Sequence, residues 1–147
     1  MISGLDHDAL QKRLLKVIPA LYAQGYTLFL CGGALGFDTL AAQAVLQCRE
    51  RCPGMKLKMV LPCREQSRLW NKKDQAIYQE LLQHADEAIW LSDAYYQGCM
   101  MMRNKYLVEH SSLCVCYYIN KKGGTSFTVA YALYQELNII NLALPEK

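Results

Sequence analysis

Two stretches of the 147-residue chain have the residue types and spacing to hold a phosphate. The first turn holds Gly32, Gly33 and Gly36, and the second holds Gly123, Gly124 and Thr125. Each turn lies between a predicted strand and a predicted helix. A glycine turn that opens a helix can point free backbone N–H groups at an anion, and the helix dipole favours negative charge there. The two turns therefore predict one anionic ligand held between them.

Each of these turns also has a purely structural interpretation. Residues 32–36 can form a tight turn against a neighbouring strand, and Thr125 or Ser126 can be a helix N-cap. Asp38 can contact a ligand hydroxyl, or it can be a first-turn carboxylate that suits the helix dipole. The glycines do not match G-x-G-x-x-G, and no acidic residue closes the following strand at Pro62. This argues against a nicotinamide-dependent oxidoreductase.

Arg103 is the cation best suited to an anionic ligand. It stands near the start of a predicted helix, where the dipole gives a cation no benefit, and its planar fork suits phosphate or carboxylate. The alternative is a salt bridge to Glu109 or Asp93. The neighbouring Asn104 can be a helix cap or an amide that contacts a base.

Trp70 and Tyr95 offer flat faces for a nucleobase, although large aromatic residues also serve as core. Trp90, inside a predicted strand, is interpreted as core. No nucleophile and base stand at a recognisable spacing, so no catalytic residue is assigned and enzymatic activity stays open. Asp86 and Glu87, just before a strand, are interpreted as solvated.

The seven cysteines are an odd number without C-x-x-C spacing, which predicts reduced thiols in a cytoplasmic protein. Cys48 and Cys52 lack a second pair, so no metal site is expected, and no cofactor is assigned. The chain has no apolar run of the ~18 residues that span a membrane and no signal-peptide pattern at its start. The net charge of +3 permits an anionic small ligand but gives little reason to expect nucleic acid.

Alternating helical and strand patterns predict how these residues are positioned. Helices are expected at about 8–24, 37–52, 72–84, 100–110 and 125–137, with strands at 27–31, 56–61, 87–91, 113–118 and 138–144. Short connections favour one α/β domain, residues 1–147, with a mostly parallel sheet of about five strands covered by helices. In the helix at 72–84, Ile77, Leu81 and Leu82 form the predicted inner face. Ligands of such sheets bind beyond the carboxyl ends of the strands, where every candidate residue lies.

The ordered motifs make the chain similar to one known family. They are Gly32-Gly33-x-x-Gly36-Phe37-Asp38, Pro62-x-x-x-Gln66-x-x-x-Trp70, Ala85-Asp86, Leu91-Ser92-x-x-Tyr95, Gly98-Cys99-Met100-x-x-Arg103-Asn104 and Gly123-Gly124-Thr125. Over roughly residues 9–144 the chain resembles the YpsA-like branch of the SLOG superfamily, which includes the DprA proteins and the Lonely Guy phosphoribohydrolases. The resemblance implies a Rossmann-like three-layer fold, a bacterial origin and a nucleotide-type ligand bound by these motifs, Gln66 included.

Two departures from that branch bear on function. Its members usually begin with a strand that ends in Thr-Gly-His-Arg, and here the first helix comes almost at once. We hypothesise that a second copy covers the gap, which would make a homodimer, or that the neighbouring strands close up. Lonely Guy enzymes also carry a glutamate where Thr128 stands here.

The sequence therefore predicts a domain that binds a nucleotide or nucleotide derivative such as ADP-ribose, NAD or a nucleotide sugar. A phosphoribohydrolase that cleaves nucleoside monophosphates is one alternative, and Thr128 disfavours it. A DprA-like module that binds single strands is another, and the low net charge disfavours it.

Overall fold

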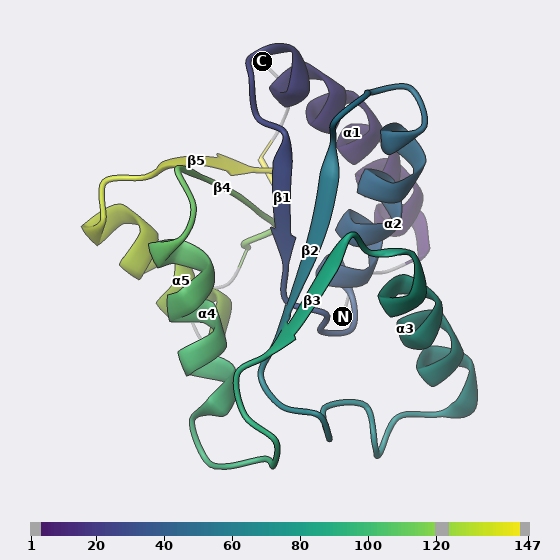
Figure 1. Ribbon diagram of the computed structural model, residues 1–147. Coiled ribbons are helices and arrows are strands. Elements are labelled where there is room, and N and C mark those ends of the chain that lie inside the picture. Colours follow the sequence, from purple (N-terminus) through teal and green to yellow (C-terminus); the bar gives the residue numbers. More distant parts are fainter. Residues whose placement is uncertain (1–3, 120–123, 145–147) are drawn as a thin grey trace.

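The computed structural model describes residues 4–119 and 124–144, and Figure 1 shows helices on both sides of parallel strands. The helices are α1 (Gly4–Ala23), α2 (Phe37–Arg49), α3 (Lys72–His84), α4 (Cys99–Glu109) and α5 (Gly124–Tyr134). The strands are β1 (Leu28–Cys31), β2 (Lys56–Leu61), β3 (Glu87–Trp90), β4 (Leu113–Cys116) and β5 (Asn138–Asn141). The predicted α/β class is confirmed, and the strands alternate with helices throughout.

The strands form two sheets rather than the single sheet that was predicted. The first has the order β1-β2-β3 and the second pairs β4 with β5, and all pairs are parallel. In Figure 1 the second sheet lies beside β1, with its strands running across the direction of β1. Within the described ranges β1 and β4 are not paired, so these neighbouring strands have not closed up into one sheet.

Side-chain contacts join the second sheet to the rest of the molecule. Arg13 of α1 donates hydrogen bonds from Nη1 to the backbone carbonyls of Leu142 and Leu144, just after β5. Val115 of β4 and Ile140 of β5 pack against the main hydrophobic core. The two sheets are therefore held together by one core and by α1, without a shared hydrogen-bond ladder.

The core lies between the first sheet and the helices that cover it. Alternate residues of β2, namely Leu57, Met59 and Leu61, are fully buried. Val60 on the opposite face is also fully buried, as expected for a central parallel strand covered by helices on both sides. No helix within residues 4–119 and 124–144 is long and apolar enough to cross a membrane.

Asp86 ties the amino ends of two strands to a helix. Its Oδ2 accepts a hydrogen bond from the backbone N–H of Leu57 at 2.8 Å and another from Arg49 Nη1 at 2.7 Å. The Leu57 N–H, helped by Arg49, lowers the pKa of the Asp86 carboxyl. Asp86 is exposed, as predicted, and its carboxylate also fixes β2 against α2 and the start of β3.

Candidate functional site

The turn after β1 is built around close backbone packing. Gly33 has φ +75°, and a Cβ placed on it would stand only 2.5 Å from Cδ2 of Leu61, so a larger residue cannot fit. Gly36, with φ +90°, is the N-cap of α2. Asp38, in the first turn of α2, accepts a hydrogen bond from the Ala34 N–H at 3.1 Å. The carboxylate therefore holds the glycine turn closed.

Arg103 of α4 reaches back to this turn. Its guanidinium donates from Nη1 to the carbonyl of Gly32 and from Nε to Asn104 Oδ1 at 2.8 Å, and the residue is only 4% exposed. A Cβ on Gly32 would lie 2.7 Å from Arg103 Nη1 and 2.9 Å from Asp38 Oδ2. The backbone of Gly32 therefore lies between a buried cation and a carboxylate.

Electrostatics couple the two charges at this turn. Burial lowers the pKa of Arg103, and attraction to Asp38 opposes that shift. Burial also raises the pKa of the Asp38 carboxyl, against the influence of Arg103 and the Ala34 N–H. Removing these charges from water is costly, and each compensates only part of the other's penalty.

The salt bridges considered for Arg103 are not formed. Asp93 pairs instead with Arg64, whose Nε lies 3.3 Å from Asp93 Oδ1. Glu109 accepts a hydrogen bond from the Tyr131 hydroxyl at 2.6 Å. Arg103 is therefore held by Gly32 and Asn104, with Asp38 as its nearby countercharge.

The loop after β2 brings polar side chains into buried positions. Gln66 is 8% exposed, and neither its Nε2 nor its Oε1 has a hydrogen-bond partner within residues 4–119 and 124–144. Trp70 is half-buried and meets Tyr78 edge to face, with ring centroids 5.3 Å apart. The Tyr78 ring reaches the glycine turn, since its Cε1 lies 3.4 Å from a Cβ placed on Gly33.

Tyr78 lies beside the glycine turn, and it is not among the candidates predicted from the sequence. Its hydroxyl is buried, with no hydrogen bond of ordinary geometry among the described residues, and burial raises its pKa to about 12 against a smaller opposing effect of Trp90. The signal was present, because Tyr78 stands three residues before Leu81 and so shares its inner face of α3. The helical spacing by itself predicts Ile77, Leu81 and Leu82 on that face.

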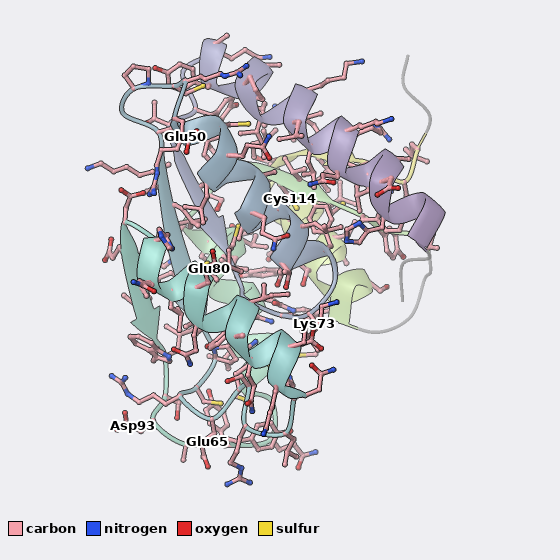
Figure 2. All side chains as sticks on the ribbon, turned by 90° about the vertical axis from the view of Figure 1, so that its right-hand side faces the viewer. Glu50, Glu65, Lys73, Glu80, Asp93 and Cys114 are labelled. Atoms are coloured by element: carbon pink, nitrogen blue, oxygen red, sulfur yellow. The ribbon has the colours of Figure 1, made fainter. Side chains whose placement is uncertain are left out.

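The loop after β3 lies beside the loop after β2. The backbone N–H of Tyr95 donates to Glu65 Oε1 at 3.0 Å, and the Arg64–Asp93 pair joins the same two loops. In Figure 2, Glu65 and Asp93 lie at one end of the molecule and Glu50 lies toward the other. The Tyr95 side chain is 62% exposed, so its ring lies on the surface of this end.

The second predicted turn is only partly within the described structure. Gly124 and Thr125 begin α5, as expected for a turn that opens a helix. Gly123 and the lysine pair before it lie outside the described residues. The convergence of the two turns on one ligand therefore stays a prediction.

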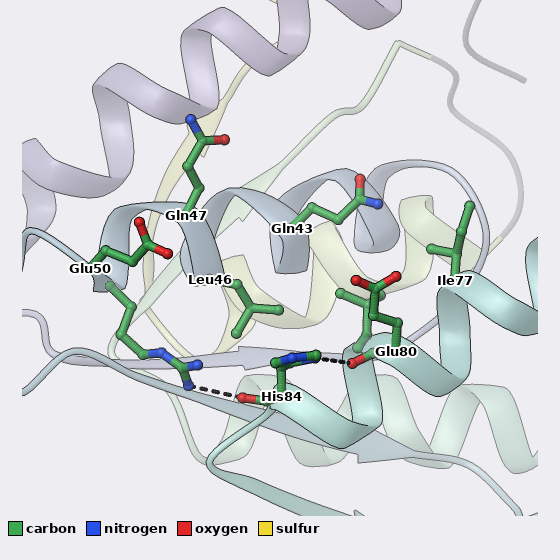
Figure 3. A pocket seen from close by; sticks show the side chains of 9 residues that line it. Gln43, Leu46, Gln47, Glu50, Ile77, Glu80 and His84 are labelled. Carbon is green, nitrogen blue, oxygen red and sulfur yellow. Dashed lines mark hydrogen bonds between the residues drawn. The ribbon is translucent and has the colours of Figure 1, made fainter.

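A separate groove lies between α2 and α3, with a cavity volume of about 380 Å³ (Figure 3). Leu46 and Leu81 are apolar residues of its lining, and Gln43, Glu80 and His84 are polar ones. Arg49 and His84 are the last residues of their helices, so the groove extends toward the amino ends of the strands, away from the glycine turn. None of the residues predicted to bind a ligand lines it.

The α/β order, the parallel strands and the strand-to-helix glycine turn define a Rossmann-like α/β protein. A family model described as the YspA SLOG family (YpsA) matches residues 6–141, and the chain belongs to this family. The chain is 30% identical over 126 residues to a UPF0398 protein of Halalkalibacterium halodurans, with 84% of this chain and 67% of the relative covered.

Two further relatives extend this comparison. The chain is 29% identical over 136 residues to the SPbeta prophage-derived protein YoqJ of Bacillus subtilis, covering 84% of this chain and 80% of that protein. It is 23% identical over 141 residues to a UPF0398 protein of Bacillus thuringiensis, covering 92% of this chain and 77% of that protein. The resemblance to the YpsA-like branch is therefore confirmed.

Proposed function

We propose that the chain binds a nucleotide or nucleotide derivative at the carboxyl ends of β1 and β2. The observation that carries this proposal is the buried guanidinium of Arg103, which lies against the backbone of Gly32 beside the first turn of α2. An arginine fork next to backbone N–H groups at a helix start is suited to phosphate. The anionic part of the ligand would bind there.

Arg103 keeps hydrogen-bonding capacity for a ligand. A guanidinium has five N–H donors, and the bonds to Gly32 and Asn104 use two of them. Asp38 contributes a carboxylate that can accept from a ribose hydroxyl on its second oxygen, since Oδ2 already accepts from Ala34. This set favours a ligand that carries both negative charge and hydroxyls.

The aromatic residues supply a surface for the base. Trp70 is half-buried at the edge of the site, and Tyr95 is exposed on the adjacent loop. Base stacking on such rings contributes about 1–3 kcal/mol. The proposal covers binding and assigns no reaction, because Thr128 stands where Lonely Guy enzymes have their glutamate.

A thermal-shift panel tests the proposal with ADP-ribose, NAD, AMP and a nucleotide sugar. A ligand at 100 times its Kd stabilises the folded state by about 2.7 kcal/mol, which raises the Tm of a domain this size by roughly 5–10 °C. Arg103→Met removes the charge but keeps an apolar stem of similar length, so it should lose the response. It also leaves the Asp38 carboxylate without its countercharge, so circular dichroism must first show that the variant is folded. Arg64→Met changes an exposed arginine of the same end and is the matched control.

The expected result is a response in the wild type and in Arg64→Met, and none in Arg103→Met. No response from the wild type to any of the four compounds would contradict the proposal. An equal response in the wild type and in Arg103→Met would place the ligand elsewhere.

A further inference from the structure

Gln66 has a buried amide that the protein itself does not use. The residue is 8% exposed, and both polar atoms of its side chain lack a partner among the described residues. Leaving a buried polar group without a hydrogen bond costs about 1–3 kcal/mol per group. Such a position needs an explanation, because most buried polar side-chain atoms in proteins are hydrogen-bonded.

The loop around Gln66 is ordered by other contacts. Its backbone turns through hydrogen bonds from Arg68 N to Glu65 O at 3.1 Å and from Trp70 N to Ser67 O at 3.1 Å. The side chain of Gln75 in α3 donates to the carbonyls of Ser67 and Arg68 at 2.9 and 3.2 Å. The Gln66 side chain takes no part in these bonds, so it does not hold the loop in shape.

Tyr78 connects this loop with the glycine turn. Its ring meets Trp70 of the loop edge to face and approaches Gly33 of the turn. The Gln66 amide, whose two polar atoms have no partner among the described residues, is thus linked through Tyr78 to the edge of the sheet where Arg103 lies. The charged group would hold an anion, and the uncharged amide suits a neutral part of the same ligand.

We propose that the Gln66 amide contacts the hydrogen-bonding edge of the nucleobase and that the base is adenine. A glutamine amide presents one donor and one acceptor side by side, which pairs with N6–H and N7 of adenine in a bidentate contact. Trp70 lies in the same loop and offers its ring to the base. This inference rests on the proposed function and adds the class of base that the site selects.

Isothermal titration of the full chain with three probes tests this assignment. AMP, IMP and ribose 5-phosphate share the phosphorylated ribose, and only AMP carries the N6 amine. One bidentate amide contact corresponds to about a tenfold to hundredfold difference in Kd, so AMP should bind more tightly than IMP by that factor. Gln66→Met has a similar volume without the amide and should bring the AMP and IMP values together while leaving ribose 5-phosphate unchanged.

The matched control is Gln47→Met, an exposed glutamine of α2 far along the chain from this loop. It should keep the full preference for AMP. Equal Kd values for AMP and IMP in the wild type, with both binding, would refute the adenine contact and leave the anion site standing. A Gln66→Met variant with changed Tm but unchanged preference would show a structural role and refute it as well. Failure of all three probes to bind the wild type would refute the proposed function and this inference with it.

Discussion

Substituting alanine for Gly32 tests the contact on which the candidate site depends. Gly32 does not have a positive φ, so its backbone conformation is one that alanine can adopt. The added methyl would instead stand 2.7 Å from Nη1 and 2.8 Å from Cζ of Arg103, and 2.9 Å from Oδ2 of Asp38. The substitution therefore acts through space and not through backbone strain.

The size of the effect follows from these distances. Bringing the 2.7 Å approach to the 3.4 Å of an ordinary contact needs a shift of about 0.7 Å in the guanidinium, which breaks or weakens its bond to the Gly32 carbonyl. A hydrogen bond to a charged group contributes about 1.5–3 kcal/mol, and overpacking a core costs about 1–3 kcal/mol. We expect Gly32→Ala to lose roughly 2 kcal/mol of stability, a fall in Tm of about 4–8 °C.

A double-mutant cycle in urea identifies the source of that loss. Lysine at position 103 lacks the guanidinium fork, so the methyl of Gly32→Ala should be tolerated better in an Arg103→Lys background. The two substitutions should therefore show a coupling free energy of about 1 kcal/mol or more. Additive losses, or a Gly32→Ala variant as stable as the wild type, would refute the packing of Arg103 against Gly32.

Two further predictions concern the frame around the site. Asp86→Asn should remove about 1 kcal/mol at pH 7, since the Leu57 N–H loses a charged acceptor. Because the pKa of Asp86 is lower in the folded state, its contribution to stability is present above about pH 4 and is lost as pH falls through the lowered pKa. Urea unfolding measures the free energy of unfolding at pH 7 and at pH 3, and the difference between the two values should be smaller for Asp86→Asn than for the wild type. If a second copy covers the open edge of β1, Leu28→Lys should turn a dimer into a monomer in light scattering, because Leu28 is 57% exposed on that strand. The control is Leu133→Lys on α5, where Leu133 is 61% exposed, and this variant should stay dimeric. A wild type that is monomeric at all concentrations would refute that dimer.

The sequence predicted the elements well because its patterns are local. Glycine and proline stand at the ends of the predicted segments, and the bounds of β2 and α3 agree with the structure. The division into two sheets could not be predicted in the same way. Strand pairing depends on contacts between distant segments, and four-residue strands such as β1 and β4 carry little information about their neighbours.

At the site, residue types were predictable and partners were not. The position of Arg103 at a helix start, where the dipole disfavours a cation, indicated a role beyond helix stability. Its partner could not be read from the sequence, because Gly32 offers only a backbone carbonyl 71 residues away. Asp86 is exposed, as its charge predicted, but its hydrogen bond with the backbone N–H of Leu57 could not be predicted in the same way.

Three residues at the carboxyl edge of the first sheet, Gly32, Arg103 and Gln66, each lower the stability of the fold when considered alone. A glycine at a position that alanine could adopt costs roughly 0.5–1 kcal/mol, a buried guanidinium carries a desolvation penalty, and the amide of Gln66 has no partner in the part of the chain that the structure describes. The first two explain each other, because Gly32 makes room for Arg103, but neither explains why a cation is buried there. Local departures from stabilising choices are expected where a protein binds or reacts. An anionic ligand with a neutral polar edge, as proposed, would satisfy the cation and the amide together.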